Sequence, residues 1–214
     1  MPADRTAPPR VSPPDLPDEL RPASPARRAD LIAAEVVCDG EADLAHSSLE
    51  QCMIRGAADR LDLTGATLLD VTLSDLRAPV VSLRATTIRR LRIDGGRIGT
   101  LDLSEARVHE LEIHGARIDY LTLGGAKAED VLIVDAQLRT LDVPQAVLSR
   151  VRFDDSRVDE VDTRGLTAKD VDLRGLDALA FLDVSSLKGT TLSTRQVEML
   201  ATVFAKAAGI DVRD

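Results

Sequence analysis

The chain has 214 residues and a formal net charge of −9, and 44% of its residues are apolar although only 2% are aromatic. This length suffices for one domain with an aliphatic core, and the acidity argues against direct binding of nucleic acid. No apolar run approaches the ~20 residues of a membrane span, and no apolar secretion signal follows Met1. We therefore expect a cytoplasmic protein that does not contact membranes. The absence of Asn and the excess of Arg over Lys are typical of a GC-rich, bacterial genome.

Residues 1–30 hold most of the 10 prolines, together with many charged residues and alanines. Such a segment cannot bury enough apolar surface to order itself, so we predict a Pro-rich N-terminal tail that is extended or disordered. A docking role for the stretch PPDLP is a weaker alternative to a plain flexible tail.

Residues 31–60 are the irregular start of a repeat. Leu44, Leu49 and Ile54 follow one another at steps of five, but the step from Ile54 to Leu63 is nine residues instead of ten. One residue is therefore missing from the pattern, and we predict a distorted corner near residues 55–60.

From 61 to 180 the five-residue period is nearly unbroken. The large aliphatic residue at the centre of each unit recurs at Leu63, Leu68, Leu73, Leu83, Ile88, Ile93, Ile98, Leu103, Val108, Ile113, Ile118 and Leu123. A second inward-type residue stands two places before each of them, and the two share one side of an extended segment. A period of five fits neither a helix nor a plain strand. It fits a short extended segment and a turn, repeated so that the chain coils and stacks on itself.

The residue two places before the centre alternates along the chain. It is Leu or Val in every odd unit, such as Leu61, and mostly small in the even ones, such as Ala66. The residue two places after the centre is often Gly or Asp, which tolerate the backbone of a tight corner.

The units ADLAH (42–46), LDLTG (61–65) and LDLSE (101–105) resemble the A(D/N)LXX consensus of the pentapeptide-repeat family. The resemblance implies an all-β solenoid over residues 31–190, namely a right-handed quadrilateral parallel β-helix with four pentapeptides in each coil. The chain departs from the family in having Leu or Val before the centre of half its units and Phe at the centre only once. A leucine-rich repeat is the main alternative, but its period is 20–29 residues and its Asn or Cys ladder is missing.

Residues 191–214 predict a C-terminal α-helix and tail that cover the last coil. Ser193 and Gln196 form a capping-box pattern, and Gly209 is placed as the residue just past a helix end. The helix is apolar on two sides, so one side can lie on the rod and the other on a second chain. We expect a homodimer through this helix, and packing on its own rod alone is the alternative. The candidate dimer residues are Val197, Met199, Leu200, Val203 and Phe204.

No motif for chemistry is found in the sequence. His109 and His114 are five residues apart and fall on adjacent faces, so a shared metal is not expected, and Cys38 and Cys52 match no metal or redox spacing. Carboxylates are frequent, but they lie in outward columns, and a filled rod offers no concave site for acid–base catalysis. We expect no catalytic residues, no cofactor and no metal, and each cysteine is interpreted as a small buried apolar residue.

Residues twenty apart stack on one another in such a rod. Asp70, Arg90, Glu110, Asp130, Arg150 and Asp170 form one column, whose charges alternate over much of its length; we interpret it as a structural charge ladder. Two opposite faces are acidic and give the candidate partner surface, namely Asp62, Asp102, Asp142, Asp162, Asp94, Glu112 and Asp154.

The sequence therefore predicts a non-enzymatic scaffold that binds a macromolecular partner through its rod surface. The resemblance also implies an alternative, because some relatives, the quinolone-resistance proteins, are dimers that mimic DNA and bind gyrase or topoisomerase IV. B-DNA carries about one charge per 1.7 Å, so six coils of about 29 Å would match roughly 17 phosphates. Each acidic face has a net charge of only three or four, so the match is local.

Overall fold

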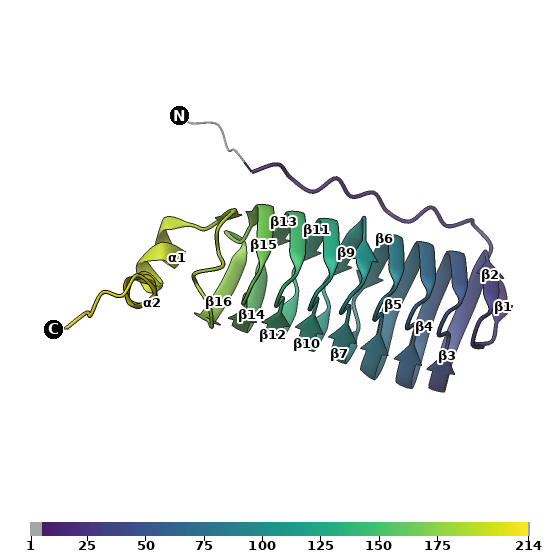
Figure 1. Cartoon of the computed structure of the whole chain (residues 1–214). Helices are drawn as coiled ribbons and strands as arrows, with labels where there is room; N and C mark the ends of the chain where they lie inside the picture. Colours follow the sequence, from purple (N-terminus) through teal and green to yellow (C-terminus); the bar gives the residue numbers. More distant parts are fainter. Residues whose placement is uncertain (1–5, 214) are drawn as a thin grey trace.

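The computed structural model describes residues 6–213, which form a parallel β-solenoid, two short helices beyond its last coil and an extended N-terminal segment along its side (Figure 1). All the strands belong to one hydrogen-bonded sheet. The strands are β1 Arg21–Ala23, β2 Asp30–Ile32, β3 Ala34–Asp43, β4 Ser48–Asp62, β5 Thr67–Ser82, β6 Thr87–Asp94, β7 Arg97–Asp102, β8 Arg107–Val108, β9 Leu111–His114, β10 Arg117–Thr122, β11 Lys127–Val134, β12 Gln137–Asp142, β13 Val147–Asp154, β14 Ser156–Asp162, β15 Thr167–Asp172, β16 Leu176–Phe181 and β17 Thr190–Thr191; the helices are α1 Thr194–Met199 and α2 Ala201–Ala207.

The strand register shows that one coil is twenty residues long. Arg117 of β10 lies opposite Arg97 of β7 on one side and Gln137 of β12 on the other, and every pair is parallel. Twenty residues are four five-residue units, as the repeat predicts. The predicted all-β solenoid is thus confirmed.

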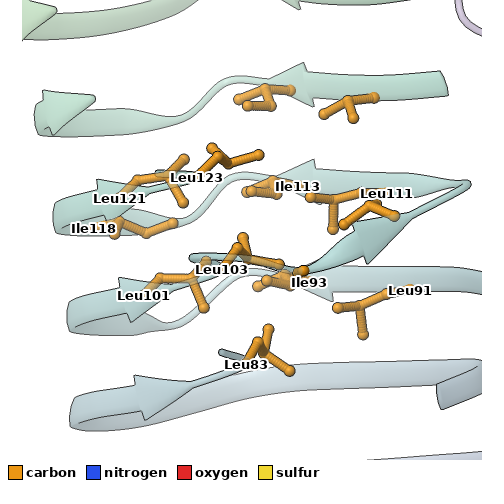
Figure 2. Close-up of a cluster of buried hydrophobic side chains, with 14 of the residues drawn as sticks. Leu83, Leu91, Ile93, Leu101, Leu103, Leu111, Ile113, Ile118, Leu121 and Leu123 are labelled. Carbon is orange, nitrogen blue, oxygen red and sulfur yellow. The ribbon is translucent and has the colours of Figure 1, made fainter. Parts of the chain in front are cut away.

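The two inward columns of the repeat form the core. Leu63, Leu73, Leu83 and Ile113 are fully buried, and equivalent residues of successive coils lie above one another, such as Leu101 and Leu121 (Figure 2). Stacked aliphatic side chains exclude water from the whole length of the rod, which is the main stabilising contribution in a repeat whose single units cannot bury a face.

Many corners of the coil use left-handed backbone at the residue two places after a centre, whereas the corner column of Thr100, Tyr120 and Thr140 does not. Gly65 and Gly125 adopt φ of 67° and 65°, while Asp70 and Asp130 adopt 54° and 57° in another corner column. Glycine does so without steric cost, and Asp is among the side chains that tolerate this region. The Gly and Asp residues of the pattern are therefore explained by the turns.

Strand register is irregular near the start of the rod. It shifts between Arg55 and Ala57 where β4 pairs with β5, and between Gly40 and Glu41 where β3 pairs with β4. Gly56 has φ of 105°, and a Cβ there would lie 2.6 Å from the carbonyl oxygen of Cys38. These shifts occupy the stretch where the repeat advances by nine residues instead of ten.

Both cysteines are buried and free: Cys38 and Cys52 belong to the aliphatic core, as the sequence predicts. Burial raises the pKa of each thiol, so both remain protonated at neutral pH. In the described part of the chain, no helix has the length and apolar character needed to cross a bilayer.

The end of the rod is covered by two helices where the sequence predicts one. The predicted capping box is present, because Ser193 accepts from the Gln196 N–H and the Gln196 side chain accepts from the Ser193 N–H. The helix is interrupted at Leu200, which is buried and has φ of −91° and ψ of 0°. Hydrogen bonds of the i to i−4 type continue across it, from Leu200 to Gln196 and from Phe204 to Leu200. Gly209, with φ of 77°, follows the end of α2.

The N-terminal segment differs from a free tail. Residues 6–20 are extended and run along the outside of the rod, from the end with β15 and β17 back to β1 (Figure 1). Residues 1–5 of the predicted tail lie outside the described residues. The rod surface near this segment is therefore not open to solvent along its length.

Candidate partner surface

The first group of predicted partner residues forms one straight column. Register places these residues in line along successive coils: Asp43, Asp62, Ser82, Asp102, Thr122, Asp142 and Asp162. At the usual strand spacing of ~4.8 Å, the distance from Asp62 to Asp162 is roughly 24 Å. The structure thus brings these four predicted carboxylates together on one face.

Most of these carboxylates also shape the turn that follows them. The backbone N–H two residues later donates to Oδ1 of Asp62 at 2.9 Å, of Asp102 at 2.8 Å and of Asp162 at 3.1 Å. This is an Asx turn, in which the side chain replaces a backbone acceptor and fixes the corner. One oxygen of each residue is thus used by the fold, and the second remains for a partner or an ion pair.

Asp142 is the exception in the column. Pro144 stands two residues later and has no N–H, so this turn cannot be closed in the same way. Its Oδ2 instead accepts from the Tyr120 hydroxyl at 2.6 Å and from Thr122 Oγ1 at 3.3 Å. Burial and the Asp142 carboxylate together raise the pKa of Tyr120 to about 12. The hydroxyl therefore stays protonated and donating over the physiological range.

Arginines neutralise the two ends of the column. Arg164 donates to Asp162 through Nε at 2.8 Å and through Nη2 at 2.5 Å, and Arg60 Nη2 lies 3.4 Å from Asp62. Hydrogen bonds from Arg164 lower the pKa of Asp162 despite its burial. Among the described residues, neither Asp102 nor Asp142 has a cationic side chain within ion-pair distance, although the Arg164 guanidinium also attracts Asp142 from the next coil. The least compensated charge of the column therefore lies between its two ends.

The second group of predicted residues is far less acidic in the structure. Asp94 lies 3.4 Å from Arg92, and Asp154 accepts from Arg152 Nε at 2.8 Å. Glu112 is buried, with Arg92 Nη1 at 3.5 Å and His114 Nε2 at 2.8 Å. Because each carboxylate has a cationic or hydrogen-bonding neighbour, this face offers little free negative charge.

Both candidate histidines pair with glutamates. Nδ1 of His109 lies 2.8 Å from Glu129, and His114 pairs with Glu112 as described above. No group of three or more His, Cys, Asp or Glu within residues 6–213 has the arrangement of a metal site.

The candidate dimer residues divide into two sets. Leu200 is buried against its own rod and Phe204 packs on the same core, whereas Val197, Met199 and Val203 are 45%, 54% and 39% exposed. Most of the exposed large apolar side chains of the described residues lie at this end of the molecule: Leu179, Leu182, Val197, Met199, Val203, Ile210 and Val212. The rod therefore ends in an apolar surface.

Gln196 has a second role that the capping-box pattern does not predict. Its Nε2 donates to the carbonyl oxygens of Leu173 at 2.7 Å and Leu176 at 2.8 Å. Leu173 directly follows β15, whose last residues still pair with β17, whereas Leu176 begins β16, beyond which no further strand of the described chain supplies donors. One amide thus caps both the helix and the open end of the sheet, and only the position of the helix on the coil reveals it.

The chain was compared with known proteins. No protein-family model matches it, and no curated protein matches it. Among solved structures it is similar to QnrB1, a plasmid-mediated fluoroquinolone resistance protein, with 14% identity, 90% of this chain and 96% of the other covered, and a TM-score of 0.23. Superposition at this level adds nothing to the architecture that the strand register already establishes.

Proposed function

We propose that this protein is a non-enzymatic scaffold that binds a macromolecular partner through the outside of its rod. The observation that carries the proposal is the straight column from Asp62 to Asp162, whose central carboxylates, Asp102 and Asp142, lack ion-pair partners among the described residues. A rigid row of fixed negative charges favours a partner with a complementary basic surface. The interior is filled by stacked side chains, so recognition belongs to the outer faces.

Substitution of the column tests this function. The variant Asp102→Asn with Asp142→Asn keeps the side-chain shapes and removes two charges, and the matched control is Asp119→Asn with Asp159→Asn, which changes two exposed acids elsewhere. Proteins from cells of the source organism are captured on each variant and quantified. We expect a basic protein that the wild-type chain and the control retain and the column variant loses. Identical protein sets on all three would refute the proposal.

We also propose that two copies associate through the apolar end that carries α1 and α2. Val197, Met199 and Val203 project from these helices without cover from the described rod. Burial of such side chains stabilises association by about 25 cal/mol per Å² of apolar surface. Light scattering of the full chain should give twice the mass of one chain, and Val197→Asp with Val203→Asp should halve it. Glu198→Ala with Lys206→Ala changes exposed polar residues of the same helices and should leave the dimer intact. A monomeric wild-type chain would contradict this proposal.

A second candidate function is binding to a topoisomerase in place of DNA. The same column favours it, because its carboxylates lie in a straight line as phosphates do along a duplex. The ~24 Å between Asp62 and Asp162 correspond to about 14 phosphate charges in B-DNA, far more than the column holds. The structure therefore supports mimicry over a short stretch only.

A supercoiling assay with DNA gyrase separates the two functions. A mimic should inhibit supercoiling, or protect the enzyme from a fluoroquinolone, at micromolar concentration, and Asp102→Asn with Asp142→Asn should weaken the effect. If the wild-type chain neither inhibits nor protects, the mimic is excluded and the scaffold remains.

A further inference from the structure

The N-terminal segment is bound to the charge ladder by its backbone. Four of its N–H groups donate to the four carboxylates of this ladder: Ala7 to Asp170 Oδ1 at 3.3 Å, Arg10 to Asp130 Oδ1 at 2.8 Å, Ser12 to Glu110 Oε2 at 3.0 Å and Asp15 to Asp70 Oδ1 at 3.0 Å. At its start, Thr6 Oγ1 lies 2.6 Å from Thr191 Oγ1. Residues 6–20, here named the strap, therefore run antiparallel to the order of the coils.

The spacing of the strap matches the spacing of the coils. From Asp70 to Asp170 there are five coil steps, or roughly 24 Å at ~4.8 Å each. From Ala7 to Asp15 there are eight residues, or roughly 25 Å at the ~3.1 Å rise of a polyproline II segment. Five prolines within residues 8–17 favour that conformation. Donors of the strap can thus meet acceptors of the ladder along the whole contact without strain.

The ladder is organised to accept these donors. Arg90 holds Asp70 with two bonds of 2.5 and 2.7 Å, and Arg150 holds Asp130 with two of 2.6 and 2.7 Å. The Asp70 and Asp130 side chains are only 6% and 11% exposed. Two of the four carboxylates that meet the strap, Asp70 and Asp130, are therefore held in place by the arginine of the next coil.

The side chains of the strap that are partly covered by the rod recur with a regular spacing. Val11, Pro14, Pro17 and Leu20 are half-buried at steps of three residues, the period of polyproline II. Charges also correspond. Hydrogen bonds from Arg150 lower the pKa of Asp130 against its burial, and Arg10 adds to this effect. The hydrogen bond to Asp70 raises the pKa of Arg90, and Asp15 adds a smaller contribution. Residues 6–9 further line a crevice with Arg152 and Asp172 of the neighbouring face. The strap thus covers one side of the rod with a specific register.

We propose that the ladder is a peptide-binding groove that recognises the backbone N–H groups of an extended, proline-rich segment, with the strap as its built-in occupant. A proline-rich segment of another protein can then bind only when the strap leaves. Carboxylates that accept backbone N–H groups tolerate variation of side chains, so the groove selects for conformation and donor spacing. Tethering gives the strap an effective concentration in the millimolar range, so the free groove is a minor state in the wild-type chain.

Two matched variants of the full chain test the groove. The first is Arg10→Pro, Ser12→Pro and Asp15→Pro, which removes three donating N–H groups; the preceding residues are already extended, so proline is tolerated. The second is Arg10→Ala, Ser12→Ala and Asp15→Ala, which removes the same side chains and keeps the N–H groups. The probe is a fluorescent synthetic peptide of residues 6–20, followed by anisotropy.

We expect the peptide to bind the proline variant at least tenfold more tightly than the wild-type chain or the alanine variant. Addition of Asp130→Asn to the proline variant should reduce this binding at least tenfold, and a peptide N-methylated at positions 10, 12 and 15 should not bind. The strap lies outside the strands, so circular dichroism should show an intact solenoid in each case. Absence of binding to a folded proline variant, or equal binding to the proline and alanine variants, would overturn the proposal.

Discussion

Arg150 donates two parallel hydrogen bonds to Asp130, Nε to Oδ1 at 2.6 Å and Nη2 to Oδ2 at 2.7 Å. The two residues occupy the same corner of consecutive coils, and both have left-handed backbone, with φ of 52° and 57°. Arg150 also reaches Glu129 at 3.1 Å. One guanidinium thus joins two coils at a position where the backbone alone makes a tight turn.

Replacement of Asp130 should destabilise the rod. Asp130→Asn removes the charge that the two hydrogen bonds from Arg150 neutralise and leaves this largely covered guanidinium with Glu129 as its one carboxylate partner among the described residues. We expect a loss of about 1–3 kcal/mol in the free energy of unfolding. Chemical denaturation followed by circular dichroism measures the change. Asp119→Asn is the control, because this exposed carboxylate lies 3.9 Å from Arg139 and should cost less than about 0.5 kcal/mol. Equal losses in both variants would contradict the role of the ladder.

Stability should decrease in acid. Asp62, Asp130, Asp162 and Asp172 all have a pKa below the ordinary value in the folded chain, and in each case hydrogen bonds and cationic neighbours outweigh burial. A lowered folded pKa stabilises the fold above the unfolded value near 3.9, and this contribution is lost as pH falls through the folded pKa. We expect the Tm to be nearly constant from pH 7 to about 5 and to fall below about pH 4. Asp162→Asn should make that fall shallower.

Substitution by alanine should change the free energy of unfolding by different amounts at three glycines. Gly96 has φ of 88°, and a Cβ there would collide with the carbonyl oxygen of Leu76, so we expect Gly96→Ala to cost more than about 2 kcal/mol. Gly115 has φ of 61° but open space around it, so its cost should be about 1 kcal/mol. Gly124 has neither feature, and alanine should be neutral or slightly stabilising. Thermal unfolding of the three variants gives the order, and a different order would show that the corners relax.

The end of the rod should depend on one side-chain amide. Gln196→Ala removes the donor to Leu173 and Leu176 and breaks the capping box, and we expect a loss of about 1–3 kcal/mol. Hydrogen exchange should increase first in β16 and α1 and little in the central coils. Glu198→Ala, on the exposed side of α1, is the control. If exchange increases evenly along the rod in Gln196→Ala, the amide does not protect the end specifically.

The sequence alone predicts the coil because the buried residues recur with the same five-residue period as the turns. Leu63 and Leu68 are inward in any structure that turns every five residues, so period and composition together determine the core. The capping box of Ser193 was equally readable, since it depends on residues three apart. The capping box, which is a local pattern, and the buried columns, which follow the five-residue period, can therefore be predicted from the sequence alone.

The surface was harder to predict because outward position does not reveal what a carboxylate binds. Asp62 and Asp102 point outward, yet each closes a turn. An Asp that is followed two places later by a residue with a backbone N–H is the sequence signal for such an Asx turn. Glu112 is outward and buried by Arg92 and His114. Side-chain pairing across coils depends on rotamers that no period encodes.

Order in the strap could not be derived from composition. Prolines and charges predict a segment that cannot form a core by itself, and residues 6–20 form none. Their contacts arise because the rise of an extended chain matches a column of acceptors, and that comparison requires the coil spacing and the corner positions of Asp70 and Asp130.

The match in spacing between the strap and the rod limits how the gene can be lengthened by duplication of coils. Repeat proteins change length most simply by gaining or losing whole units, here twenty residues that advance the rod by ~4.8 Å. The strap can lengthen only in steps of about 3.1 Å. A duplication between Asp70 and Asp170 would therefore leave donors and acceptors out of phase over part of the contact. The length of the strap therefore constrains the number of coils that it can span.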